Sequence, residues 1–482
     1  MYADISKKLR MMLSYKDLII FLIPFIIFMV YLYVYNPGIA RFDSFTQLHQ
    51  IATGNFDNWH PFFHTFIEMV CLKIYPDTKA IAFLQIMVFS IIWMIICSYF
   101  RNDNLENGID KEFIFQAIFT LIICLIPINP LSAITFLKDT LFSYFLLFAC
   151  FLIKVILDKK GDVSLFFIAI FSLNLAFLAQ VRHNGTVLVL VFLLIFCAYL
   201  IYEYGNRKLP ISIVSLTVLF IILILTLNVV YDVEDNDKDA VMAKVMHMLV
   251  DYELNITMDD SDKASIGKVI KNYTRSEQVY DITLLDPITG LSDPDAYNEN
   301  KLEILGIAMK YSIKHPIHFL QYAFHSAPMV WHIAQEQDWH GHSYGTSTDG
   351  ANKRFYNNTQ PVTTFDNITS KNSQTKMYND LDSIVNEARL NSVLDTLFNK
   401  PAFYMYLSFV LMGAIYLLSR SKDVFLVYLP NFLNIAIIFA STPAQHYRYL
   451  YPNLLVFYLL VIMFISIIAK RKSSSNHISS SQ

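Results

Sequence analysis

The sequence is poor in charged residues. Only 16% of its 482 residues are Asp, Glu, Lys or Arg, whereas 55% are hydrophobic, and a soluble domain is nearer to one quarter charged. The net charge is −3, with no basic arm or stripe, so nucleic acid is excluded as an expected partner. The chain also lacks an internal repeat.

Cysteine is scarce as well. Four of the five cysteines lie inside apolar runs, and no pair has the spacing of a disulfide framework or a zinc motif. We therefore interpret them as small apolar packing residues. Aromatic residues are abundant by contrast, with 39 Phe and 29 Tyr, which suits long membrane contacts and interfacial anchors.

The apolar residues form ten runs that could cross a membrane as helices, since a span needs about 20 mostly apolar residues. The runs are 18–35, 81–100, 113–128, 139–157, 163–181, 185–203, 209–230, 401–419, 424–441 and 452–469. The sequence therefore predicts an all-α polytopic membrane protein with about ten transmembrane helices.

Positive charge indicates how these spans are oriented. If the N-terminus is inside, the inner segments carry 16 Lys and Arg residues and the short outer segments carry six. Because Lys and Arg favour the cytoplasmic side, both termini are predicted to be cytoplasmic. The run 305–333 is fairly apolar but holds four histidines and two prolines, so we interpret it as helices on, or dipping into, the outer face.

This topology divides the chain into segments. Residues 1–231 form an N-terminal transmembrane module with a large first outer loop at 36–80. Residues 232–400 are the long polar region, predicted as an extracytoplasmic, mostly helical and loop domain between spans seven and eight. Residues 401–470 hold the C-terminal transmembrane helices, and 471–482 are predicted to be a disordered cytoplasmic tail.

Residues suited to chemistry gather at the outer ends of the spans. They are Asp43, Asp57, His60 and His64 in the first outer loop, Lys138 and Asp139 at the fourth span, Arg182 and His183 after the fifth, and Arg448 and Tyr449 before the tenth. Lys138, Arg182 and Arg448 oppose the positive-inside bias, so each needs a nearby anion. A lipid phosphate is the expected anion, and we predict that these cations and His183 bind it.

Asp43 supplies the opposite charge. A carboxylate beside cations can act as a general base, or can hold a metal or a hydroxyl. Sugar transfer from a lipid phosphate would use both the cations and the carboxylate, because cations stabilise the leaving phosphate while a base activates the acceptor hydroxyl. Asp43 is the first candidate base and Asp57 the second. Asp43 also suits the N-cap of a short helix, and both roles stay open.

The remaining polar residues are candidates for substrate contact, namely Asp57, His60, His64, Asp139 and Tyr449. His60, His64 and Glu68 are spaced four apart and could share one helix face, which is metal-ligand spacing. A divalent metal is therefore left open, beside a polar contact to substrate and a plain structural role. The Lys138–Asp139 pair could equally be an interfacial ion pair, and Arg448 could snorkel among tyrosines.

Four features together resemble the GT-C membrane glycosyltransferases, which include the protein mannosyltransferases and bacterial relatives that decorate cell-envelope polymers. They are the acidic residue after the first span, the Lys-Asp pair in FLKDTLFSYF, the Arg in VRHNG and the late loop HYRYLYP. The first outer loop, DSFTQLHQ…WHPFFHT, is similar to uncharacterised bacterial proteins of this superfamily.

The resemblance implies a GT-C-like fold in a bacterial plasma membrane with its active site on the outer face. It implies inverting transfer from a polyprenyl-phosphate sugar to an envelope polymer, lipid or protein, and an essential acidic residue that maps onto Asp43. The chain departs from the mannosyltransferases in two respects. Ser44 stands where they have a second acidic residue, and the polar domain lies between spans seven and eight.

Two other functions stay open, and membrane lipid is an expected partner in each. A transporter or flippase needs polar residues near mid-membrane. The candidates are Gln116, Asn174, Asn228, Asn431 and Asn434. A polysaccharide polymerase or ligase would instead use a lipid-diphosphate donor and would leave similar outer Arg and His clusters.

Overall fold

The computed structural model describes residues 14–101, 111–235, 240–271, 273–333, 375–441 and 445–479. Within these ranges the regular elements are helices, and β-type pairing is limited to four isolated bridges. The prediction of an all-α chain is therefore confirmed.

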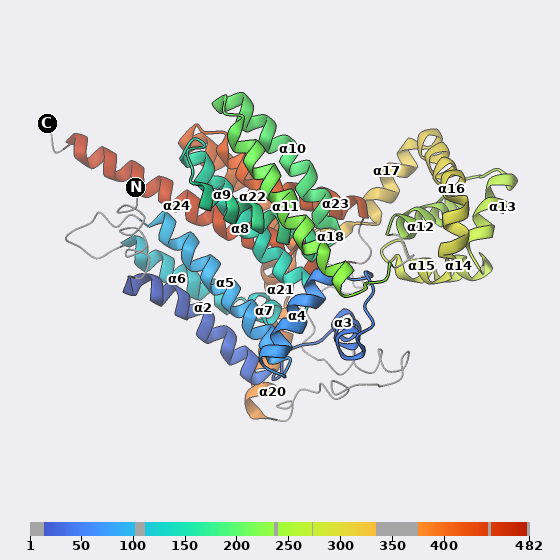
Figure 1. The fold of residues 1–482 in the computed structure, drawn as a ribbon, viewed down its shortest axis with the longest axis horizontal. Coiled ribbons are helices and arrows are strands. Elements are labelled where there is room, and N and C mark those ends of the chain that lie inside the picture. Colours follow the sequence, from blue (N-terminus) through green and yellow to red (C-terminus); the bar gives the residue numbers. More distant parts are fainter. Residues whose placement is uncertain are drawn as a thin grey trace.

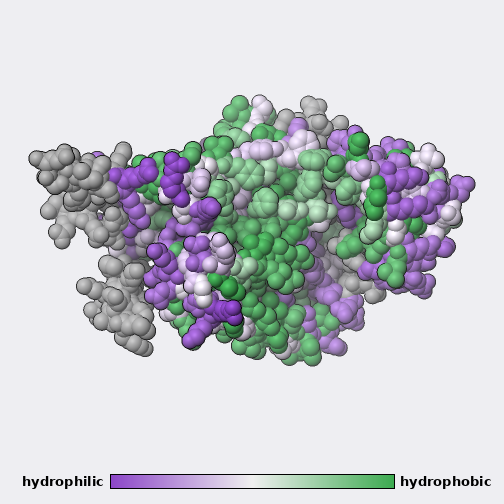
Figure 2. All heavy atoms as spheres, turned by 90° about the horizontal axis from the view of Figure 1, so that it is seen from above, coloured by the Kyte–Doolittle hydropathy of each residue, from purple (hydrophilic) through white to green (hydrophobic). Residues whose placement is uncertain are grey.

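Eight helices of the described ranges are long and apolar enough to cross a membrane. They are α2 (Tyr15–Val34), α5 (Lys79–Phe100), α8 (Lys138–Asp158), α10 (Asn184–Tyr204), α11 (Lys208–Val230), α22 (Pro401–Ser419), α23 (Asp423–Ser441) and α24 (Tyr451–Ser479), the last preceded by the 3-10 helix η1 (Tyr447–Leu450). They share one apolar core and form a bundle (Figure 1). Figure 2 shows a broad hydrophobic band between two polar ends, which fits a multi-pass integral membrane protein.

Two of the ten predicted spans form shorter helices. The run 113–128 becomes α6 (Lys111–Leu125) with 15 residues, and the run 163–181 becomes α9 (Leu165–Val181) with 17. Pro127 restricts the residue before it and so ends α6. At about 1.5 Å per residue both fall short of a hydrocarbon layer of roughly 30 Å. Both pack against longer helices of the bundle, α6 with one face against α2 and α9 against α8 and α11.

The helices run in alternating directions, so the bundle has two ends. We call one the basal end, where α2 begins and α5, α8 and α24 reach their far ends. There Arg101 Nη2 lies 2.5 Å from Asp17 Oδ1, and Tyr99 Oη donates to Asp158 at 2.8 Å. α24 continues to Ser479, through most of the tail predicted to be disordered.

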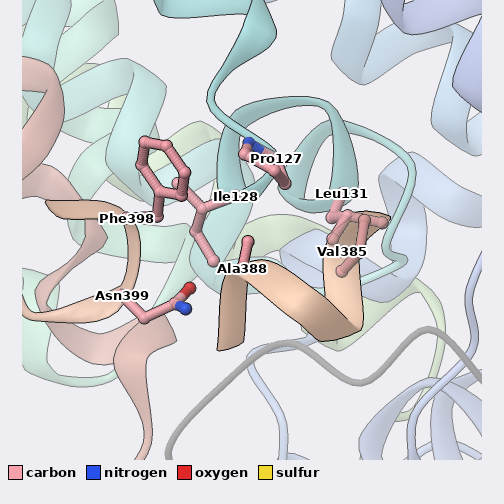
Figure 3. A pocket seen from close by; sticks show the side chains of 7 residues that line it. All are labelled: Pro127, Ile128, Leu131, Val385, Ala388, Phe398 and Asn399. Atoms are coloured by element: carbon pink, nitrogen blue, oxygen red, sulfur yellow. The ribbon is translucent and has the colours of Figure 1, made fainter. Parts of the chain in front are cut away.

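The opposite, apical end is closed by short helices. They are α3 (Phe42–Thr53), α4 (Phe62–Ile74), α7 (Ile128–Ala133), α20 (Lys376–Leu390) and α21 (Ser392–Asn399). Figure 3 shows side chains of α20 and α21 packed against Ile128 and Leu131. The cavity between them measures about 10 Å³, which is room for about one water molecule. This contact is therefore packing and offers no space for a ligand.

The first part of the polar region after α11 forms a helical body with its own core, beside the bundle in Figure 1. Its helices are α12 (Ala240–Asn255), α13 (Asp260–Val269), α14 (Tyr273–Val279), α15 (Asp286–Leu291), α16 (Pro294–Lys314) and α17 (Pro316–His325), and the short α18 (Pro328–Trp331) that follows packs against α22 and α23 in the core of the bundle. The run 305–333 is divided among the last three, each of which begins with proline, and none is a candidate span. The sequence from 343 to 379 is rich in Ser, Thr, Asn and Gly, which predicts a loop, and all but its last five residues lie outside the described residues.

Candidate functional site

The segment that leads into α3 is paired with the turn that leads into α8. The Ile39 N–H donates to the Ile134 carbonyl at 2.9 Å, and the Phe136 N–H donates back to Ile39 at 3.0 Å. Gly38 permits this approach, because its φ is +111° and a Cβ there would lie 2.5 Å from the Phe136 ring. As a result Asp43, in the first turn of α3, faces the start of α8.

Further hydrogen bonds fix this geometry. The Ser44 hydroxyl donates to the Phe136 carbonyl, and Gln85 of α5 donates to two carbonyls of the turn 133–135, at 3.2 and 3.0 Å. The N-cap of α3 is Arg41, and its N–H donates to the Ser44 hydroxyl at 3.0 Å. Asp43 therefore does not cap α3, and its carboxylate is left for other contacts.

Asp43 meets two cations from distant parts of the chain. Its Oδ2 accepts hydrogen bonds from Lys138 Nζ at 3.1 Å and from Arg448 Nη1 at 3.0 Å. No described residue donates to its other oxygen, Oδ1. The three side chains are 12 to 18% exposed, so all three can be reached from outside.

Asp139 is a second, more deeply buried anion. Arg182 Nε lies 3.3 Å from Oδ1, and Arg448 Nε lies 3.6 Å from Oδ2. Both guanidinium groups lie over the ring of Tyr449, at 4.8 and 4.9 Å from its centroid, and Arg448 also donates to the Tyr449 hydroxyl at 3.0 Å. Tyr449 therefore contacts both arginines through cation–π interactions.

We call these five ionic residues, Asp43, Lys138, Asp139, Arg182 and Arg448, the charged cluster. It contains three cations and two carboxylates, so positive charge is in excess by one. Burial alone would raise the pKa of Asp43, but the charges of Arg448 and Lys138 outweigh it and hold that pKa well below its usual range. Excess positive charge in a partly desolvated site favours an incoming anion.

The turn between α9 and α10 positions Arg182. The Gly185 N–H donates to the Arg182 carbonyl at 2.8 Å, and the Thr186 hydroxyl donates to Ala179 at 2.9 Å. A Cβ on Gly185 would lie 2.0 Å from the Leu178 carbonyl oxygen. The backbone of this turn can therefore come so close to α9 only because residue 185 is glycine.

Two predicted histidines lie beside the charged cluster. His60 Nδ1 is 3.1 Å from Lys138 Nζ. Burial first, and the charge of Lys138 second, lower the pKa of His60 to about 3, so at neutral pH the uncharged ring accepts from the ammonium. His183 Nε2 lies 3.2 Å from the carbonyl of Trp59. It ties the α9–α10 turn to the loop that carries His60, and burial lowers its pKa too.

Asp57 lies outside the charged cluster. Its carboxylate accepts the N–H of Trp59 at 2.9 Å, and its backbone forms an isolated bridge with Glu234. These contacts shape the turn before His60. The structure thus brings Asp43, rather than Asp57, to the three cations.

His64 is fully buried in α4. Its Nδ1 lies 3.1 Å from Gln47 and 3.7 Å from Glu68 Oε1. Burial lowers the pKa of His64 to about 3 and raises that of Glu68 well above its usual range. His60 lies before α4, and its ring contacts Lys138. His60, His64 and Glu68 therefore do not come together as the metal ligands that their spacing allowed. In the described parts of the chain, no group of three His, Cys, Asp or Glu residues is arranged to hold a metal ion.

Gln445, just before η1, was missed by the sequence analysis. Its Nε2 donates to the carbonyls of Thr283 at 3.1 Å and Ser326 at 3.0 Å, and its Oε1 accepts the Met329 N–H at 3.0 Å. This buried side chain links the helical body to the segment that carries Arg448. The signal in the sequence was a single glutamine in a loop with three tyrosines, AQHYRYLYP.

Comparison with known proteins adds nothing to this geometry. The chain matches no family model, no curated protein and no solved structure. What the site can do is therefore argued from its own atoms. They offer a carboxylate with one unengaged oxygen, and three cations that can bind an anion beside it.

Proposed function

We propose that the chain is an integral membrane glycosyltransferase of the GT-C type. It moves a sugar from a polyprenyl-phosphate donor to a hydroxyl of an extracytoplasmic acceptor, with inversion. The observation that carries this proposal is the contact of Asp43 with both Lys138 and Arg448 at the apical end. Such a transfer needs a base and phosphate-binding cations within one site, and here the two are in contact.

The three cations are the proposed donor-phosphate site. Arginine presents a planar fork to phosphate oxygens, and lysine adds a point charge. Arg182 has a buried Nη1 with no hydrogen-bond partner, so it can donate to a phosphate oxygen. When the bond between the sugar's anomeric carbon and the phosphate oxygen breaks, these cations stabilise the charge of the leaving polyprenyl phosphate.

Asp43 is the proposed base. The acceptor oxygen attacks the anomeric carbon as the phosphate leaves, and the hydroxyl proton passes to the Asp43 carboxylate. In the unliganded chain, Arg448 and Lys138 hold the pKa of Asp43 low. A phosphate that draws these cations toward itself weakens their hold on Asp43, which raises its pKa toward the range that a base needs. Donor binding thereby activates the base.

The proposal places the apical end on the outer face of a bacterial plasma membrane and both termini in the cytoplasm. The distribution of Lys and Arg along the sequence supports this orientation. It also requires α6 and α9 to cross, which brings the spans to ten. Both are apolar helices that pack against longer helices of the bundle.

Three of the five polar residues considered for the transporter alternative pair between helices. Asn431 donates to Asn453 at 3.1 Å, Asn174 to a carbonyl of α8 at 3.0 Å, and Gln116 to a carbonyl of α5 at 2.8 Å. Side chains paired between helices in this way stabilise packing and are not arranged around a shared transport path.

The test is sugar transfer by the purified protein in detergent with radiolabelled polyprenyl-phosphate monosaccharides. We expect turnover of one donor and a loss of about 10²–10⁴-fold in Asp43→Asn, the usual range for removing a general base. Asp77→Asn is the matched control, because Asp77 lies in the same loop but pairs with Lys79 at 3.2 Å.

Thermal unfolding of each variant establishes that it is folded. Full transfer by folded Asp43→Asn would overturn the proposal. Turnover restricted to a diphosphate-linked donor would replace it with the polymerase or ligase function.

A further inference from the structure

A cavity of about 270 Å³ lies at the basal end. It is formed where α5, α8 and α24 meet, and its polar lining comes from Tyr99, Lys154, Asp158, Ser466 and Lys470. Lys154 and Lys138 lie on the same helix, sixteen residues apart, which is roughly 24 Å along its axis. The cavity is therefore remote from the charged cluster.

Among the described residues that line this cavity, the charged side chains are two lysines and one aspartate. Asp158 is already engaged, because Lys154 Nζ contacts its Oδ1 and Tyr99 donates to its Oδ2 at 2.8 Å. An ammonium has three N–H donors, so Lys154 can serve a second anion as well. Lys470 adds another positive charge, and Ser466 adds a hydroxyl at the same surface.

The position of the cavity suits a lipid headgroup. It lies at the ends of three candidate spans, the level at which headgroups of a bilayer are found. The remaining lining is apolar and comes from Phe100, Met463 and Ile467. The volume of about 270 Å³ is far above the roughly 10–15 Å³ that one water molecule needs, so it leaves room for a phosphate with a glycerol unit and is too small for a whole lipid.

We propose that this basal cavity binds the phosphodiester headgroup of an anionic phospholipid. The phosphate lies against Lys154 and Lys470, and Ser466 donates its hydroxyl to the same group. Basic pockets between transmembrane helices bind lipid headgroups by this chemistry. The inference rests on the cavity and its charges, and it does not depend on the proposed sugar transfer.

The test is native mass spectrometry of the full chain released from detergent after incubation with phosphatidylglycerol or phosphatidylcholine at equal concentration. We expect wild type to retain phosphatidylglycerol in preference. Lys154→Gln should reduce that retention about tenfold, as expected for the loss of one charge-assisted hydrogen bond. Ser466→Leu should reduce it as well, because it fills the cavity and leaves the charges in place.

Lys159→Gln is the matched control, since Lys159 is an exposed lysine at the same end of α8 that does not line the cavity. Equal retention of both lipids by wild type, or unchanged retention in Lys154→Gln and Ser466→Leu, overturns the proposal. So does an equal loss in Lys159→Gln. A third arm adds excess inorganic phosphate. Displacement of the lipid makes free phosphate the occupant and overturns the lipid assignment, whereas retention supports it.

Discussion

The two ends of the bundle use ionic residues in different ways. At the basal end, the Arg101 guanidinium contacts the Asp17 carboxylate at 2.5 Å, and each side chain is 1% exposed. At the apical end, one carboxylate oxygen of Asp43 is shared by two cations, and the side chains are 12 to 18% exposed. A pair that solvent cannot reach holds helices together, whereas accessible cations that share one carboxylate oxygen can also bind a ligand. Access to solvent therefore distinguishes this structural pair from the candidate site.

The largest effect that this comparison predicts is structural. Arg101→Gln leaves the buried Asp17 carboxylate without its cation, so the free energy of unfolding should fall by about 3–5 kcal/mol. Thermal unfolding in detergent measures the loss, and transfer per folded molecule should not change. A loss below about 1 kcal/mol, typical of an exposed pair, would remove the contrast between the two ends.

Arg448→Gln should show the reverse pattern. The chain should fold, while sugar transfer falls about 10²–10³-fold, because a preorganised donor to the developing phosphate charge is lost. Initial rates against donor concentration measure kcat and KM separately. Arg448→Lys should recover only part of the activity, since lysine lacks the planar fork. Normal kcat and donor KM in folded Arg448→Gln would show that the apical cations are structural too.

Lowering the pH should reduce the folding stability of the apical end over a defined pH range. His446 caps η1, where its ring accepts the N–H of Arg448 at 3.3 Å. Burial, aided by nearby cations, lowers the pKa of both His60 and His446 to about 3, against about 6.5 in an unfolded chain. The unfolded chain therefore binds protons first as pH falls, and stability present above pH ~6.5 is lost below it, by up to ~1.4 kcal/mol per pH unit for each histidine. Melting temperatures between about pH 7.5 and 5 measure this. His446→Gln should show a shallower fall, and an identical slope would contradict the assignment.

The smallest predicted effect concerns Gln445. Gln445→Met keeps the length of the side chain but removes its hydrogen bonds to the helical body, so Arg448 is held less accurately. We expect kcat to fall about tenfold or less, as for a modest misplacement of a binding group, with the donor KM raised. Unchanged kcat and KM in the folded variant would mean that the helical body does not influence the apical site.

The gathering of the apical residues was predictable from the sequence. Asp43 and Lys138 are 95 residues apart, and Asp43 and Arg448 are 405 apart, yet they meet because their spans begin or end at the same end of the bundle. Hydropathy and span order determine that much. They also predict the separate helical body, because a long polar segment cannot lie within the hydrocarbon layer.

The detailed arrangement could not be predicted. Whether Asp43 or Asp57 reaches the cations depends on the pairing of Ile39 with the turn before α8, a contact that no local pattern encodes. His64 points into buried packing rather than toward Lys138 because of the path of the chain before α4. The contacts of Gln445 likewise join residues 162 positions apart, and hydropathy carries no information about such a side chain.

The two glycines that shape the apical end have a consequence for any mutational map of this chain. A Cβ on Gly38 would lie 2.5 Å from the Phe136 ring and one on Gly185 would lie 2.0 Å from the Leu178 carbonyl oxygen, so even alanine at either position requires the neighbouring atoms to shift. In a saturation scan scored by function, both positions would tolerate as little as Asp43 or Arg448, although neither contributes a charged or polar side chain. Intolerance to substitution would therefore identify the glycines that shape the backbone of the site as well as the residues that bind or react. Replacements that keep the shape of a side chain but remove its charge would distinguish the two groups.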